Sequence, residues 1–198
     1  MDLPDSSLAR AAARLVRTAS PPALAHHALR SYWWAVALAE VDGVRYDPEL
    51  LFVAAALHDL GLEPEFDSGR PFEIDGGRAA AELVRKHGGT DESARTVEQA
   101  IVLHMAREIV LADGAETYLL WESTGTDVAG SRLAELPAGW VDRVTAALPR
   151  LDFTDVFAGR VADQAARKPQ SRAASLWDAG LLERMASYAW DADHGLAS

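Results

Sequence analysis

A histidine and an aspartate stand side by side where the most apolar run of the sequence ends. His58 and Asp59 follow the unbroken apolar run at residues 50–57. Burying a carboxylate without a partner costs on the order of several kcal/mol. Either this helix surfaces at its end and both side chains are solvated, or a metal ion just beyond the helix end neutralises Asp59 and binds His58. A cation is favoured there by the negative end of the helix dipole.

A metal site needs further ligands, and the chain has six histidines. His27 lies in a predicted long helix, with Arg30 and Trp34 at i+3 and i+7 on the same face. His104 follows another apolar stretch and is expected to point inward. Each histidine alone is more simply explained as a core residue. Together with the His-Asp pair they favour a metal site.

Three other residues have simpler local explanations. Asp127 follows Gly125 and Thr126, and an aspartate at such a turn is usually a helix cap. His87 precedes two glycines and fits a solvated position at a helix end. His194 lies in the tail.

The elements that must position these residues are all predicted to be helices. Serine or aspartate followed by proline starts a helix at Ser20-Pro21-Pro22 and at Asp47-Pro48. The apolar-polar alternation of strands is absent. The helix at 48–61 is apolar on every side and should be the buried central one. A loop is expected at 61–74, Asp75 should cap the helix after it, and Gly125-Thr126-Asp127 should interrupt another. The expected helices span residues 7–17, 22–42, 48–61, 75–87, 91–112, 115–121, 137–148, 154–167 and 173–190.

Composition narrows the classes of function. A chain of 198 residues fits one domain, residues 1–198, and its net charge of −11 disfavours nucleic acid and anionic membranes as partners. The absence of cysteine excludes disulfides and thiol catalysis. The N-terminus has no signal-peptide pattern, and no apolar run approaches the roughly 20 residues that span a bilayer. We therefore expect a cytoplasmic protein.

The chain resembles the HD superfamily at four positions. His27, the pair His58-Asp59 and the distant Asp127 match the H…HD…D signature of that superfamily. More narrowly, the chain is similar to its cyanamide hydratase-like branch. The segments that carry this similarity are AHHALRSYWWAVALA at 25–39, VAAALHDLGL at 53–62, FEIDGGRAAAELVRKHG at 72–88, EQAIVLHM at 98–105 and STGTDVAG at 123–130. The similarity covers about residues 21–130, and the helices expected at 137–190 should pack onto this core or onto a second subunit.

The resemblance implies an all-α HD-domain helical bundle with one metal. The implied ligands are His27, His58, Asp59 and Asp127, and His104 would line the substrate side. Two positions differ from the pattern. His26 stands where that branch often has asparagine, and Asp75 stands where binuclear relatives carry an extra histidine. The second difference favours a mononuclear site.

Two imidazoles and two carboxylates suit a divalent transition metal. We expect zinc or iron, and manganese or nickel is also compatible. Asp59 and His104 are the expected catalytic residues, because one can orient water and the other can exchange a proton or hydrogen-bond the substrate. Arg30 either pairs with a ligating carboxylate or holds a substrate anion. The other candidates around the ligands are His26, Trp34, Phe72 and Asp75.

Three functions remain open at this point. The first is a hydrolase or hydratase in which metal-bound hydroxide attacks a small electrophile, such as cyanamide or another nitrile. The second is a phosphohydrolase of nucleotide monophosphates or similar esters, which the few arginines near the motifs disfavour. The third is a non-catalytic protein that binds a small ligand. In each case the partner is a small molecule, and a homo-oligomer is compatible with the sequence.

Overall fold

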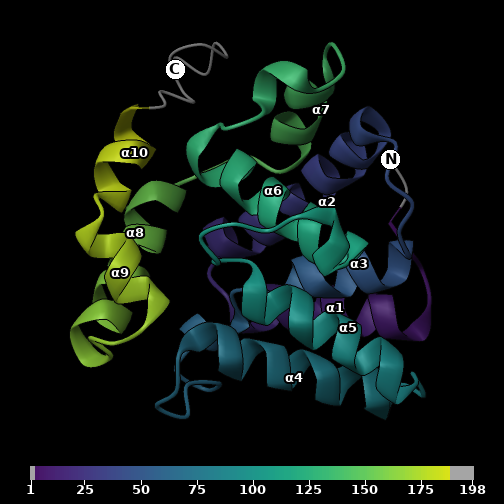
Figure 1. Cartoon of the computed structure of the whole chain (residues 1–198), viewed down its shortest axis with the longest axis horizontal. Helices are drawn as coiled ribbons and strands as arrows, with labels where there is room; N and C mark the ends of the chain where they lie inside the picture. The colour runs from purple at the N-terminus through teal and green to yellow at the C-terminus, as the bar shows by residue number, and fades with distance from the viewer. Residues whose placement is uncertain (1–2, 188–198) are drawn as a thin grey trace.

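Ten α-helices and no strand make up the described part of the chain, residues 3–187 of a computed structural model (Figure 1). This confirms the predicted all-α fold. Among these residues, no helix has the length and apolar character needed to cross a membrane. The helices are α1 (Ser7–Ala19), α2 (Pro22–Asp42), α3 (Pro48–Leu57), α4 (Phe72–Lys86), α5 (Asp91–Leu103), α6 (Ala115–Ala129), α7 (Trp140–Ala147), α8 (Phe153–Arg167), α9 (Arg172–Asp178) and α10 (Leu181–Ser187). Short 3-10 turns lie at Leu60–Leu62, Leu111–Asp113 and Leu133–Glu135.

Helix α3 is the central element, as its composition predicts. The Asp47 side chain accepts hydrogen bonds from the backbone N–H groups of Glu49 and Leu50, which caps the helix before its apolar run. Every residue from Leu51 to Leu57 is buried, and α1, α2, α4, α5 and α6 all pack against this helix. The helix ends at Leu57 rather than at Gly61, and His58 and Asp59 follow immediately.

Several expected helix boundaries are wrong. Ser20 does not cap α2; its backbone N–H bonds to Val16 at the end of α1, and α2 starts without a side-chain cap. Helix α4 begins at Phe72, so Asp75 lies inside its first turn rather than capping it. Helix α5 ends at Leu103 instead of 112, which leaves His104 at its C-terminus.

Helix α6 corrects another expectation, because it runs unbroken through Gly125 and Asp127 to Ala129. A glycine inside a helix costs only about 1 kcal/mol. The packing of α6 on α2, α3 and α5 outweighs that cost. Asp127 therefore projects from the last turn of a buried helix.

The C-terminal helices α8, α9 and α10 lie together on one side of the bundle (Figure 1). Helix α8 contacts α2, and α10 contacts α6. The segment expected as one helix at 173–190 is divided at Gly180, which adopts a positive φ of 78°. Residues 188–190 and His194 lie outside the described residues.

The loop between α3 and α4 is fastened to α8 by charged groups. The Asp67 carboxylate accepts hydrogen bonds from Gln164, Arg167 and Lys168 at 2.7–3.1 Å. These contacts, together with the packing of α8 on α2, hold the C-terminal helices over the site described below.

Candidate metal centre

Two helix ends and one helix interior bring these candidate residues together. His27 projects from α2, while His58 and Asp59 directly follow α3. His104 directly follows α5. All four side chains are buried, with exposed fractions of 1–6%. Because His58 and His104 each follow the last turn of a helix, both reach a common space beyond the helix termini.

Three ligand atoms converge in this space. The Nε2 atoms of His27 and His58 are 3.1 Å apart. Asp59 Oδ2 lies 3.5 Å from His27 Nε2 and 3.2 Å from His58 Nε2. Within residues 3–187, these three residues are the group of histidine and acidic side chains placed closely enough to hold a metal ion.

The protons of the imidazole rings favour a cation between them. His27 Nδ1 donates to Asp127 Oδ2 at 2.7 Å, and His58 Nδ1 donates to the Ala55 carbonyl at 2.8 Å. Both partners can only accept, so each Nδ1 carries a proton, and the neutral form of each ring presents its lone pair at Nε2. Two such lone pairs facing each other cannot form a hydrogen bond. Asp59 Oδ2 also has no hydrogen-bond partner, although it is buried. A divalent ion satisfies all three atoms, so these residues fit a metal.

The pKa values follow from the same crowding. Burial acts to raise the pKa of Asp59, but the neighbouring imidazoles, His58 above all, outweigh it and lower the pKa to about 2. Burial acts to lower the pKa of His58, and the Asp59 carboxylate outweighs it, so this pKa is raised. Burial lowers the pKa of His27. Burial, reinforced by the charge of His58, lowers the pKa of His104 to about 3. The Asp59 carboxylate is therefore charged, and His104 is neutral at pH 7.

His104 borders this group of ligands. Its Nδ1 donates to the Ile101 carbonyl, which leaves the Nε2 lone pair directed toward Asp59 Oδ1 at 3.8 Å. The His104 ring also makes an edge-to-face contact with His58, with centroids 4.9 Å apart. The structure thus brings His104 to the place that the sequence predicts for it, beside the ligands and on the wall of a cavity.

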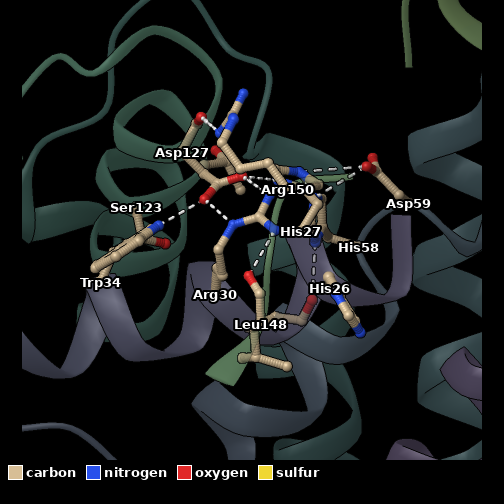
Figure 2. Close-up of polar contacts among 12 residues, drawn as sticks. His26, His27, Arg30, Trp34, His58, Asp59, Ser123, Asp127, Leu148 and Arg150 are labelled. Carbon is tan, nitrogen blue, oxygen red and sulfur yellow. Dashed lines mark hydrogen bonds and ion pairs between the residues drawn. The ribbon is translucent and has the colours of Figure 1, made fainter. Parts of the chain in front are cut away.

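The structure does not bring Asp127 among the three converging ligand atoms. Its Oδ1 accepts from Arg30 Nε at 2.7 Å and from Trp34 Nε1 at 2.6 Å. Its Oδ2 accepts from an Arg30 terminal nitrogen and from His27 Nδ1, both at 2.7 Å (Figure 2). Asp127 therefore contacts the nitrogen of His27 that faces away from the ligand group. Three of the four expected ligands therefore converge, and Asp127 contacts one of them, His27, from its far side.

The alternatives for Arg30 are decided by the same contacts. Its side chain is fully buried, pairs with both oxygens of Asp127, and donates to the carbonyls of Leu148 and Pro149. It does not line the cavity at the ligands. Trp34 also contacts Asp127 rather than the cavity.

Sequence reasoning missed two residues near Asp127 and His27. Arg150 donates to the backbone carbonyl of Asp127 at 2.7 Å, and its side chain lies 3.5 Å from Asp127 Oδ2. The Phe153 ring stacks on His27 with centroids 4.6 Å apart. Both residues follow the segments that carry motifs, and no local pattern distinguishes them from ordinary helix-start residues.

The remaining candidates do not reach the ligands. His26 Nδ1 donates to the Pro149 carbonyl at 2.8 Å. Phe72 packs in the core, with its ring 5.8 Å from His104. Asp75 accepts hydrogen bonds from the Ser68 hydroxyl and backbone and lies near Arg70. Among the described residues that line the cavity at the ligands, none of these three is present.

A cavity of about 390 Å³ opens beside the ligand group. Among the described residues that line it, Arg184 of α10 is the sole lysine or arginine. Glu122 adds a carboxyl group to the lining. Burial raises the pKa of Glu122. The lining residues are His27, His58, Asp59, His104, Met105, Ala106, Trp121, Glu122, Thr124, Gly125, Val128, Ala129, Ser131, Phe157, Leu176, Leu181 and Arg184.

Comparison with family models matches residues 24–136 to the HD domain, and the chain belongs to this family. The matched segment contains His27, His58, Asp59, His104 and Asp127, and it stops before α7. HD domains bind divalent metals and make up a superfamily of metal-dependent hydrolases, which agrees with the converging His27, His58 and Asp59 side chains. A search of curated proteins found no match.

Proposed function

We propose that this chain is a metal-dependent hydrolase or hydratase that adds water to a small neutral molecule, with nitriles as the representative substrate class. The observation that carries the proposal is the position of the ligand group at one end of a largely apolar cavity. A neutral substrate fits this lining better than an anion. Two acidic groups, Asp59 and Glu122, line the cavity, whereas Arg184 is the one arginine among the described lining residues.

His27, His58 and Asp59 would hold the metal in this proposal. When bound, a divalent metal supplies a Lewis acid that lowers the pKa of water and polarises the electrophile. Zinc or iron is the expected ion, and manganese or nickel also suits these donors. Asp127, with Arg30 and Trp34 behind it, keeps the His27 ring in the orientation that directs Nε2 to the metal.

His104 is the proposed acid-base residue. Its Nδ1 proton is engaged by Ile101, so Nε2 is the ring nitrogen that can accept a proton from water or a hydrogen bond from the substrate. The same nitrogen can then return that proton to the substrate nitrogen. For a nitrile the balance is RCN plus H2O giving RCONH2, with the water oxygen ending on carbon and both water protons ending on nitrogen.

Cyanamide itself is a very small member of the proposed class. The cavity of about 390 Å³ lies within the range of roughly 300–1,000 Å³ that holds drug-sized ligands. The size of the cavity thus supports nitriles with a larger organic group.

Phosphate-ester hydrolysis is the second candidate, and membership of the HD family supports it. A phosphate would need cations close to the metal. Arg30 and Arg150 both contact Asp127 behind His27, and neither of them lines the cavity. The third candidate is a protein that binds a small ligand without turnover.

The test is an assay of protein freed of metal and reloaded with zinc, iron, manganese or nickel. Aliphatic and aromatic nitriles are assayed beside nucleotide monophosphates, and metal content is measured. We expect about one equivalent of metal and faster turnover of nitriles than of phosphate esters. His104→Ala should reduce turnover and retain the metal, while His87→Ala, at the far end of α4, should change neither.

Efficient hydrolysis of nucleotide monophosphates with inert nitriles would replace the proposal with the phosphohydrolase. Binding of the metal without turnover of either class would favour the non-catalytic alternative. Two tightly bound metal equivalents that depend on His104 would overturn the mononuclear site.

A further inference from the structure

The wall of the cavity that faces α6 comes from helices outside the HD-domain match. Phe157 of α8, Leu176 of α9, and Leu181 and Arg184 of α10 line the cavity together with the metal ligands. The family match ends at residue 136. The candidate metal ligands therefore come from the matched family segment, while part of the cavity wall comes from the C-terminal part of this chain.

The α6 side of the cavity contains a glycine that the fold does not require. Trp121, Gly125 and Val128 lie at i, i+4 and i+7 on one face of α6, and all three line the cavity. Gly125 has no positive φ, and a Cβ built on it would meet only Ser131 Oγ, at an ordinary contact distance of 3.5 Å. Glycine is among the poorest helix formers, so alanine would suit this position better if only the helix mattered.

What the missing side chain provides is open space in the cavity that the metal ligands also line. Around the whole cavity, the lining side chains are predominantly apolar and include Met105, Trp121, Val128, Phe157, Leu176 and Leu181. Water in such a space has few polar partners, and an alkyl or aryl group displaces it favourably. A charged group would lose hydration against these apolar side chains.

We infer that the space between Gly125 and helices α8–α10 is the subsite for the apolar group of the substrate, and that Gly125 sets the size of that group. This inference rests on the proposed function in one respect, namely that the bound molecule is a substrate. The binding of an uncharged apolar group does not depend on turnover. Gly125 is therefore a specificity-determining residue, which touches the part of the substrate remote from the reacting atoms.

The direct test is the binding of N-phenyl-1-naphthylamine, an uncharged probe whose fluorescence rises in apolar surroundings. It is titrated into full-length protein, with and without metal, for the native chain and for Gly125→Leu and Gly125→Ala. A leucine side chain fills the subsite, so we expect Gly125→Leu to weaken binding at least about tenfold. Gly125→Ala should weaken it less, and should raise the melting temperature by about 1–3 °C through helix propensity.

Gly159 provides the matched control. It also lies inside a helix, α8, but it is exposed, and a Cβ there would meet nothing within 4 Å. Gly159→Leu and Gly159→Ala make the same chemical changes away from the cavity. They should leave probe binding unchanged, and Gly159→Ala should raise the melting temperature similarly.

Absence of saturable probe binding to the native chain would overturn the inference, as would equal binding by Gly125→Leu or equal losses in the Gly159 variants. If Gly125→Leu unfolds, the comparison of probe binding by Gly125→Ala and Gly159→Ala decides the question.

A second readout, the rates for nitriles of increasing chain length, tests the proposed function separately from the subsite. Turnover whose chain-length preference is the same in Gly125→Ala would leave the hydratase standing and remove the specificity role. Probe binding that depends on Gly125, without turnover of any nitrile, would keep the apolar subsite and remove the proposed reaction.

Discussion

Two buried aspartates on either side of His27 have opposite surroundings. Asp127 receives four hydrogen bonds at 2.6–2.7 Å from Arg30, Trp34 and His27. Asp59 is almost as deeply buried, yet its Oδ2 has no hydrogen-bond partner and faces two imidazole nitrogens. The protein itself neutralises and satisfies the first carboxylate. The second is arranged for a cation that the protein does not supply.

This difference assigns different tasks to the two sides of the His27 ring. On the Nδ1 side, a buried arginine-carboxylate pair holds the ring in place. On the Nε2 side, the lone pair is left for a ligand. The comparison teaches that a carboxylate in a metal-binding motif is better judged by whether its oxygens are already satisfied than by its presence in the motif.

The strongest way to break this comparison is to remove Asp127. Asp127→Ala leaves the guanidinium of Arg30 buried without its partner, so we expect the free energy of unfolding to fall by about 3–5 kcal/mol, with or without metal. Urea denaturation in the presence of a chelator measures it. Asp155→Ala, an exposed position on α8, serves as the control. A loss below about 1 kcal/mol would show that the Arg30-Asp127 pair is not a structural requirement.

Asp59 should give the opposite pattern. In chelator, Asp59→Ala should change the free energy of unfolding by less than about 1 kcal/mol, because the neighbouring imidazoles can become neutral when the charge is lost. At a metal concentration about 100 times the dissociation constant, the native chain should gain about 2.7 kcal/mol and the variant nothing. The measurement is thermal or urea unfolding as a function of metal concentration. Equal metal-dependent gains in both proteins would contradict the assignment of Asp59 as a ligand.

Trp34 sharpens the comparison on the Asp127 side. Trp34→Phe removes a buried N–H that donates to a charged oxygen, and we expect a loss of about 1.5–3 kcal/mol. Trp140→Phe is the matched control, because its indole donates to an uncharged carbonyl at 3.2 Å and should cost about 0.5–1.5 kcal/mol. Both are measured by urea denaturation. A larger loss at Trp140 than at Trp34 would contradict the view that charge strengthens the contacts of Asp127.

Asp67 extends the comparison to a carboxylate nearer the surface and should show the smallest effect. Burial opposes ionisation there, but hydrogen bonds from Lys168, Gly69, Arg167 and Gln164 outweigh it and hold the pKa well below 3.8. A lowered pKa in the folded state means that Asp67 stabilises the protein fully above about pH 4, and that this contribution is lost as the pH falls through the folded-state value.

Asp67→Asn should therefore lower the free energy of unfolding by about 1 kcal/mol near pH 7, because its partners are partly exposed. The difference from the native chain should shrink as the pH is lowered from about 4 to about 2. Urea denaturation across this range checks both statements. A difference that stays constant with pH would mean that the charge of Asp67 does not fasten the loop to α8.

The local features of the fold could be predicted because their causes are local. Ser6 accepts from the backbone of Ala9, and Asp47 caps α3, as serine and aspartate do at helix starts throughout proteins. The apolar composition of α3 predicted its burial for the same reason. Predictions failed where packing overrides local preference, as at Gly125 inside α6 and at residues 104–112 after α5.

The sequence by itself determined the helical class, the HD-domain family and the residue types of the site. His27, the His58-Asp59 pair and His104 were predicted to meet, and the structure brings them together. The division of labour between the two aspartates was decided only by tertiary structure. The partners of Asp127 come from α2 and from the segment before α8, up to 100 residues away. Whether a carboxylate meets such donors depends on how the helices cross, because a hydrogen bond requires a distance near 3 Å and a narrow range of angles. No pattern along one helix contains that information.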